Sequence, residues 1–180
     1  AFRGGTALHK LFLKPQVRYS EDIDLVQIKS GSIGDILTLL REKLQFLGTA
    51  NYTASRHNAT LIYRFESEAE PIVRLKLKIE INTREHFTVF GYNDYFYTIK
   101  SEWFNGHCAL TTYSIEELLS TKLRALYQRS KGRDLFDIYY AYQKLELDSQ
   151  KIANSFNEYL SNDGLSVSQK EFIANIEDKI

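Results

Sequence analysis

Apolar and polar residues alternate along three segments in the first half of the chain, which predicts three strands. The first runs from Ser20 to Ile28, and the other two cover residues 59–67 and 72–84. The alternation is clearest over residues 73–82, where every second side chain is apolar and those between are polar, with charges of both signs. This last strand therefore has one face in the core and one polar face.

Helical spacing replaces alternation over about 33–47, where six apolar residues form one stripe between Ser32 and Gly48 at the cap positions. The aromatic, turn-rich segment 87–104 predicts another strand or hairpin. Helical spacing returns in four later segments, over about 115–129, 134–145, 152–160 and 168–176. Strands come first and helices follow, so we predict an α+β fold with a helical C-terminal part.

Two of the later helices begin at capping boxes, in which a serine and a glutamate three residues on cap each other's backbone. The pairs are Ser114 with Glu117 and Ser168 with Glu171.

Composition limits the class of protein. A chain of 180 residues suits one domain, with or without a small helical addition. Lysine plus arginine equals aspartate plus glutamate at 23 each, so net charge indicates no polyanionic partner, although a local basic cluster can still bind one. The single Cys108 excludes an internal disulfide and suits the cytoplasm, and no apolar run is long enough to span a membrane. The chain lacks methionine and starts almost at a glycine pair, so we expect residues to be missing upstream.

The first 24 residues carry the strongest chemical signal. Gly4 and Gly5 allow the backbone to approach a phosphate, and Thr6 stands at a helix start. Asp22 and Asp24 leave one face of a strand, while Ile23 and Leu25 point to the core. Two such carboxylates about 4 Å apart repel by ~4 kcal/mol at an effective dielectric near 20, so they favour a divalent cation. The alternative interpretation is that Asp22 and Asp24 lie at a solvated strand end next to Arg18 and bind no metal.

Other charged residues extend this candidate site. Lys10 lies one helical turn after Thr6 and is a candidate triphosphate ligand or a solvated lysine. Glu80 is a candidate third metal ligand and base if its strand lies beside that of Asp22, or else a partner of a lysine or arginine. Lys122 and Arg133 are candidates to neutralise the triphosphate.

Asp134 and Asp137 lie close to these cations in the sequence. We interpret Asp134 as a helix cap and Asp137 as the group that holds Lys122 or an arginine in place.

Aromatic and histidine residues give weaker signals. The rings from Tyr92 to Phe104 are candidates to stack on a base, but core packing is the favoured interpretation. The four histidines show no metal-ligand spacing and are interpreted as ordinary surface or core residues.

Four blocks of residues, in this order, resemble the AbiEii/AbiGii toxin family of nucleotidyltransferases, to which the MenT toxins are related. The blocks are Phe2–Leu8, Arg18–Asp24, Lys78–Glu85 and Lys131–Asp137, and the resemblance covers roughly residues 2–145. It implies the DNA polymerase β-like nucleotidyltransferase fold, with a core of mixed sheet and helices over 1–110 and a helical part over 111–180. Family members are typically toxins of bacterial toxin–antitoxin or phage-defence pairs, and some add a nucleotide to the 3′ end of tRNA.

The resemblance also implies roles for single residues. It implies phosphate contacts at Gly5, Thr6 and Lys10, metal binding at Asp22 and Asp24, and a later motif of Lys122 with Asp137. Ser20 matches a serine that lies near the phosphates in related toxins and can itself be modified. This chain departs from the wider superfamily in having Glu80 where an aspartate is common, and family members usually begin well before the Gly-Gly turn.

These observations predict a nucleotidyltransferase that uses Mg²⁺, or Mn²⁺ in its place, and moves a nucleoside monophosphate from an NTP to an RNA 3′ end, with tRNA favoured. We also expect an antitoxin partner and no membrane association. Two alternatives remain: transfer to a protein side chain, as in AMPylation, and a non-catalytic nucleotide-binding module that acts through a partner.

Overall fold

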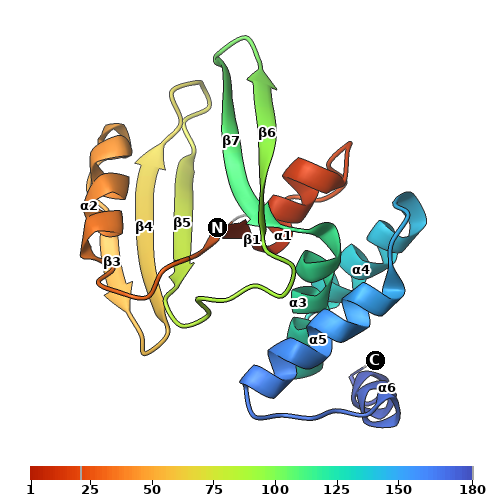
Figure 1. The fold of residues 1–180 in the computed structure, drawn as a ribbon. Helices are drawn as coiled ribbons and strands as arrows, with labels where there is room; N and C mark the ends of the chain where they lie inside the picture. The colour runs from red at the N-terminus through yellow and green to blue at the C-terminus, as the bar shows by residue number, and fades with distance from the viewer. Residues whose placement is uncertain (21, 180) are drawn as a thin grey trace. The chain divides into compact units, whose positions relative to one another are not determined.

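The computed structural model describes residues 1–20 and 22–179 and divides them into two compact units (Figure 1). Unit 1 consists of Ala1–Ala7 and Arg18–Phe87, and unit 2 consists of Leu8–Val17 and the chain from Thr88 onwards. This division differs from the expected boundary near residue 110, because the segment 88–110 and a short N-terminal segment group with the helical part. The α+β class predicted from the sequence is confirmed.

Unit 1 is built on a mixed sheet. Its strands are β1 (Phe2–Arg3), β2 (Asp22–Val26), β3 (Asn51–Ala54), β4 (Asn58–Glu66) and β5 (Arg74–Asn82). They lie side by side in the order β3-β4-β5-β2-β1. The β2–β5 pair is parallel, whereas β1–β2, β3–β4 and β4–β5 are antiparallel. The predicted ends of these three strands all lie within two residues of the ends of β2, β4 and β5.

One face of this sheet is covered by α2 (Gly34–Lys43) and the 3₁₀-helix η2 (Gln45–Leu47). Leu37 of α2 packs with Leu61 and Ile79 of the sheet, and all three are at most 5% exposed. Ile23 and Leu25 pack against the same cluster, as the alternation predicts. The predicted Ser32 cap is displaced by one residue: Ile33 is the N-cap residue, and the Ser32 hydroxyl accepts a hydrogen bond from the Gly34 N–H instead.

Unit 2 combines a hairpin with helices. The hairpin pairs β6 (Tyr92–Lys100) with β7 (Asn105–Tyr113), and its second strand had no sequence prediction. The helices are the π-helix η1 (Leu8–Phe12), α3 (Ile115–Gln128), α4 (Gly132–Lys144), α5 (Ser149–Asn162) and α6 (Gln169–Glu177). Leu8, Leu119, Ala141 and Ile152, from four of these helices, form the core. No helix within residues 1–20 and 22–179 is long and apolar enough to cross a membrane.

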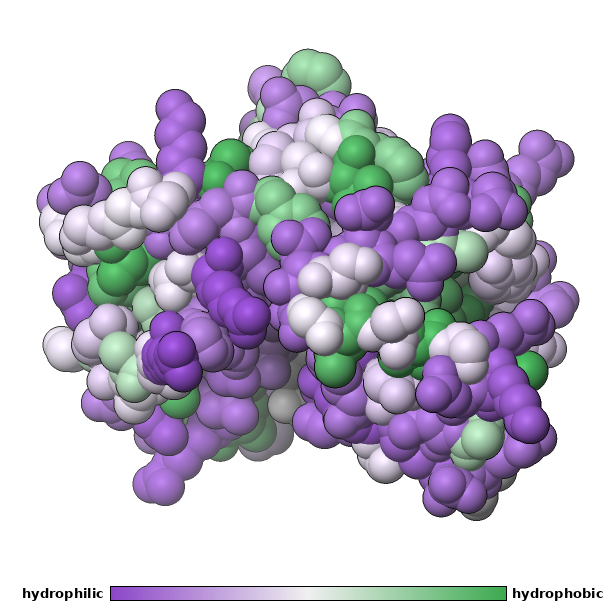
Figure 2. Space-filling view, turned by 60° about the horizontal axis from the view of Figure 1, so that its bottom comes forward, coloured by the Kyte–Doolittle hydropathy of each residue, from purple (hydrophilic) through white to green (hydrophobic). Residues whose placement is uncertain are grey.

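The favoured interpretation of the hairpin rings as core residues is wrong for three of them. Phe96 is 86% exposed, Trp103 is 89% exposed and Phe104 is 60% exposed. Tyr95 instead packs edge-on against Phe12. Polar side chains cover most of the face seen in Figure 2, with hydrophobic ones in scattered groups between them. Aromatic content alone therefore overestimates the core.

Candidate active site

Two neighbouring strands of unit 1 bring three acidic residues to one face of the sheet. In the β2–β5 pair, Asp22 lies opposite Lys78 and Asp24 lies opposite Glu80. The intervening Ile23 packs with the core on the other face. The condition set for Glu80, that its strand should lie beside that of the two aspartates, is therefore met.

Lys78 lies between these carboxylates. Its Nζ is 2.7 Å from Glu80 Oε2 and 3.4 Å from Asp22 Oδ2. The Asn58 amide donates to the other Glu80 oxygen at 3.2 Å. The hydrogen bond to Glu80 is the main cause that raises the Lys78 pKa; burial opposes it, and the charges of Glu80 and Asp22 support it. Lys78 is thus a charged member of the site, and Glu80 has the lysine partner that the alternative interpretation foresaw.

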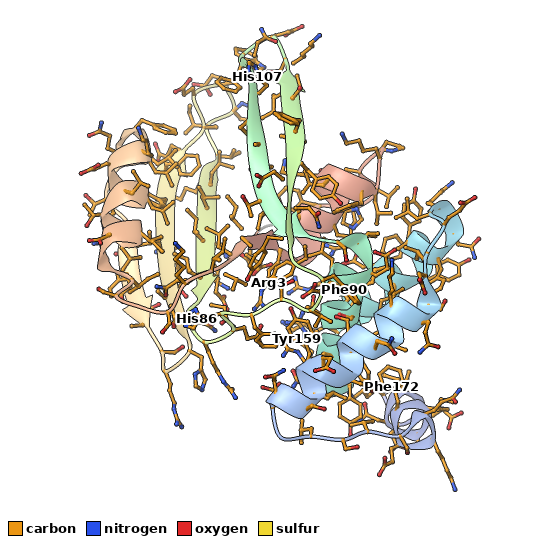
Figure 3. The ribbon with its side chains drawn as sticks, viewed as in Figure 1. Arg3, His86, Phe90, His107, Tyr159 and Phe172 are labelled. Carbon is orange, nitrogen blue, oxygen red and sulfur yellow. The ribbon has the colours of Figure 1, made fainter. Side chains whose placement is uncertain are left out.

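The Gly-Gly turn lies against the carboxylate of Asp24. Gly4 has φ +75°, and a Cβ built there would overlap Oδ2 of Asp24, whose Cγ lies 2.9 Å away. Arg3, labelled in Figure 3, forms an ion pair with Glu85 and so fixes the strand that leads into the turn. Only glycine fits at this position, because the chain has a left-handed conformation and a carboxylate fills the space of a side chain.

The start of α1 (Gly4–Ala7) is tied to β2 by hydroxyl groups. The Thr6 hydroxyl is hydrogen-bonded to the Ser20 hydroxyl at 2.7 Å and to the backbone carbonyl of Asp22. Thr6 is 6% exposed, so its side chain positions the turn against the aspartate strand. Ser20 thus lies beside the turn.

Arg18 lies beside this turn, and the sequence pattern named it only as the neighbour of a solvated strand end and as the start of the second resemblance block. A Cβ on Gly5 would lie 2.5 Å from Arg18 Nη2 and 3.4 Å from the Ser20 hydroxyl. The other terminal nitrogen of this guanidinium, Nη1, donates a hydrogen bond to the backbone carbonyl of Tyr19 at 3.0 Å. The signal available in the sequence was the basic residue two positions before Ser20.

The donor set of this face fits a magnesium ion held by two residues better than one held by three. Asp22 and Asp24 offer the oxygen ligands that Mg²⁺ prefers, and Mg²⁺ usually takes one or two carboxylates together with substrate phosphates and water. No group of three or more acidic, histidine or cysteine side chains within residues 1–20 and 22–179 has the arrangement of a metal site. The Lys78 ammonium group engages both Asp22 and Glu80 on this face.

Unit 2 holds a second charged cluster between α3 and α4, and its two carboxylates are fully buried. Lys122 Nζ is 3.0 Å from Asp134 Oδ1 and 3.0 Å from Asp137 Oδ2. Arg129 Nε is 2.8 Å from the other oxygen of Asp134, and His9 Nε2 is 3.0 Å from Asp137 Oδ1. Two cations and two carboxylates thus balance beside an imidazole that is 1% exposed.

Two interpretations of this cluster change. Asp134 is an ion-pair partner rather than a simple cap, and His9 is a member of the network that its sequence context did not indicate. Burial alone would raise the pKa of Asp134, but hydrogen bonds from Arg129 and Lys122 and their charges outweigh it and lower the pKa. The expectation that Asp137 holds Lys122 is confirmed by their contact.

The remaining predicted site residues of unit 2 are more exposed. Arg133 is exposed at the start of α4. The Lys10 ammonium lies 5.7 Å from the centre of the Tyr97 ring, which also faces Lys14. The predicted site residues thus divide into two groups. Unit 1 holds Gly4, Gly5, Thr6, Ser20, Asp22, Asp24 and Glu80, and unit 2 holds Lys10, Lys122, Arg133 and Asp137.

Glu117 is a buried carboxylate, although its spacing from Ser114 predicts that its side chain caps the backbone of α3. The Ser114 hydroxyl caps α3 as predicted, but the Glu117 side chain turns inward and is fully buried. It accepts hydrogen bonds from the N–H groups of Val89 and Phe90, the Thr88 hydroxyl and the Tyr159 hydroxyl. Phe90 and Tyr159 are labelled in Figure 3. Glu117 therefore joins α3 and α5 to the segment before β6.

Comparisons with known proteins agree on the kind of molecule. Residues 1–180 match the family model described as the nucleotidyl transferase AbiEii toxin of type IV toxin–antitoxin systems. The fold is similar to that of MenT4, a nucleotidyltransferase toxin from Mycobacterium tuberculosis H37Rv, with a TM-score of 0.63 and 15% identity over 99% of this chain and 73% of that one. No curated protein sequence matches the chain.

Two other solved structures have related folds. A candidate nucleotidyltransferase from H. pylori has a TM-score of 0.56 and 18% identity, over 100% of this chain and 73% of that chain. An antigenic nucleotidyltransferase-like protein from Paracoccidioides brasiliensis has a TM-score of 0.51 and 20% identity, over 100% of this chain and 84% of that chain.

Proposed function

Because the chain belongs to the AbiEii family of nucleotidyltransferase toxins, we propose that it transfers a nucleoside monophosphate from an NTP to the 3′ hydroxyl of an RNA, with tRNA as the favoured acceptor. A toxin of this family is expected to have a cognate antitoxin that restrains it. The observation that carries the proposal is the packing of the Gly4 turn against the Asp24 carboxylate, in register with Glu80 on the next strand.

The turn and the aspartates suit a nucleotide with its phosphates bound at the start of α1. The Arg18 guanidinium beside Gly5 supplies a positive charge there, and backbone N–H groups at a helix start are available to phosphate oxygens. Thr6 and Ser20 hold this turn to β2, so the phosphates would lie next to the two aspartates. These features support triphosphate binding by unit 1.

In the proposed reaction the acceptor oxygen attacks the α-phosphorus of the NTP. A new bond forms between that oxygen and phosphorus, the bond from the α-phosphorus to the bridging oxygen of the β-phosphate breaks, and pyrophosphate leaves with the electron pair. We assign the hydroxyl proton to the Glu80 carboxylate, which Lys78 and Asn58 hold in a fixed position. Asp22 and Asp24 would hold Mg²⁺ or Mn²⁺, which supplies Lewis-acid chemistry to the phosphates when bound.

Lys122 and Asp137 keep the roles proposed from the sequence: Lys122 as a cation toward the triphosphate, and Asp137 as the carboxylate that holds Lys122 in place. As long as two carboxylates contact the ammonium, its charge is balanced within unit 2. We therefore propose Lys122 as a positioned cation rather than a mobile one, with Arg133 as the exposed cation at the start of α4.

The test is incubation of the full chain with each labelled NTP, Mg²⁺ and total tRNA. Asp22→Ala and Asp24→Ala should lower labelling of RNA about 100-fold or more, because each removes a group that acts on the developing charge. Asp35→Ala is the matched control, since it removes an exposed aspartate from the first turn of α2. Equal labelling by all three variants and the wild type would overturn the proposed site.

The identity of the labelled product separates the proposal from its rivals. Label that migrates with protein indicates a protein side chain as the acceptor and contradicts the RNA assignment. Tight NTP binding by calorimetry, with no pyrophosphate released on either acceptor, indicates a non-catalytic nucleotide-binding module.

A further inference from the structure

The β4–β5 ribbon of unit 1 carries two basic residues directly opposite each other. Arg64 of β4 and Lys76 of β5 are register partners, so their side chains leave the same face of the sheet. Both are exposed, and neither forms an ion pair within residues 1–20 and 22–179. Like charges in directly opposed positions destabilise a sheet, which calls for an explanation.

The pair faces the same side of the sheet as the carboxylates. Lys76, Lys78 and Glu80 alternate along β5, and Asp22 is level with Lys78. At about 3.3 Å per residue, Lys76 lies roughly 13 Å along the strand from Glu80. Each strand of a DNA duplex has one phosphate per ~3.4 Å of helix axis, and on that scale the distance corresponds to about four phosphates.

The ribbon extends past its neighbours and is accessible there. Among the residues that the structure describes, β3 pairs with β4 through residues 59–62, and β2 pairs with β5 through residues 78–82. A hollow of about 480 Å³ follows the extended part. Its lining consists of Arg64, Phe65, Glu66, Arg74, Leu75 and Lys76. Glu66 is the register partner of Arg74, so that outer pair is balanced in charge and the excess belongs to Arg64 and Lys76.

The strand order places this pair on the opposite side of the aspartates from the phosphate turn. In β4-β5-β2-β1, the Gly4 turn follows β1, whereas Arg64 and Lys76 lie on β4 and β5. A transfer reaction needs two anionic substrates that meet at the carboxylates, with the nucleotide on one side and the acceptor on the other. We propose that Arg64 and Lys76 bind the phosphate backbone of the RNA acceptor a few nucleotides before its 3′ end. This inference rests on the proposed function and specifies its acceptor surface.

The test measures binding of fluorescently labelled total tRNA to the full chain by anisotropy, without NTP, from 50 to 200 mM salt. Two phosphate contacts contribute about 1.4 to the slope of log affinity against log salt for a single strand. Over this fourfold range the wild type should therefore lose about sevenfold more affinity than Arg64→Ala/Lys76→Ala. Arg64→Lys keeps the charge and should keep the wild-type slope.

Arg41→Ala/Lys43→Ala is the matched control, because it removes one arginine and one lysine from the exposed surface of α2. α2 packs on the opposite face of the sheet, so its slope should equal that of the wild type. The assignment would be overturned if the two double variants had the same slope, whether or not that slope differs from the wild-type slope. It would also be overturned if tRNA binding by the wild type did not depend on salt. Melting temperatures identify any variant that has unfolded.

The binding assay involves no chemistry, so it separates this inference from the proposed function. A slope that changes only in Arg64→Ala/Lys76→Ala supports the surface even where no nucleotide is transferred. RNA labelling with an unchanged KM for tRNA in the same variant supports the reaction and refutes the surface.

Discussion

Gly4→Ala tests whether the glycine turn and the Asp24 carboxylate form one site. The left-handed φ of +75° costs an alanine about 1–2 kcal/mol. The new Cβ would lie 2.9 Å from Asp24 Cγ, whereas ordinary van der Waals contact begins at 3.4 Å, so the carboxylate must move by at least 3.4 − 2.9 = 0.5 Å. Because a displacement of about 1 Å near the reacting atoms costs roughly 100-fold in rate, we expect a tenfold to hundredfold loss of transfer.

Gly48→Ala is the control for the backbone cost. Gly48 also belongs to unit 1 and has φ +83°, but no atom lies within 4 Å of its Cβ position. Thermal unfolding should show a similar loss of stability in both variants, whereas initial rates of NTP-dependent labelling should fall strongly only in Gly4→Ala. Equal rates in the two variants, at equal fractions of folded protein, would refute a role for the contact between Gly4 and Asp24.

Three further predictions concern the buried charges of unit 2. Glu117→Gln should lower the free energy of unfolding in urea titrations by about 2–4 kcal/mol, because the new amide NH₂ would face hydrogen-bond donors. Tyr159→Phe removes a single donor to Glu117 and should lower it by about 1 kcal/mol. Equal losses in the two variants would contradict a central role for the Glu117 carboxylate. Lys122→Ala leaves Asp134 and Asp137 buried without their lysine and should cost about 3–5 kcal/mol, and a loss below 1 kcal/mol would argue against a buried network. The lowered pKa of Asp134 means that its native carboxylate stabilises the fold at neutral pH and loses this effect as the pH falls from about 4 through the native pKa. The stability gap between wild type and Asp134→Asn should therefore narrow on acidification, and a constant gap would contradict the assignment.

Local patterns in the sequence were reliable wherever a side chain's direction follows from its own element. Alternation along β2 placed Asp22 and Asp24 on one face and Ile23 on the other, because successive strand residues point to opposite sides. Helical spacing located α2 to α6, because residues three and four positions apart lie on the same face of a helix. The Ser168–Glu171 capping box formed as predicted, since all of its atoms lie within one turn.

Predictions failed where a side chain had a choice of partners. Glu117 has the spacing of a capping box, but donors from α5 and from the segment before β6 attract it inward. His9 has no nearby partner in the sequence, and it contacts Asp137, which lies 128 residues later. The prediction for Phe96 and Trp103 was wrong in the opposite sense, since both rings were expected in the core and are exposed. Hydrophobicity alone does not show which face of a hairpin is covered.

The sequence by itself determined the family, the α+β class and the sheet face that Asp22, Asp24 and Glu80 occupy, because these depend on short motifs and on the periods of strands and helices. Only the tertiary structure decided that β5 lies parallel to β2, which brings Glu80 level with Asp24 and places Lys78 between carboxylates. It also paired Arg64 with Lys76 across two strands. Strand order and register depend on how distant segments share one core, and no local pattern in the chain encodes them.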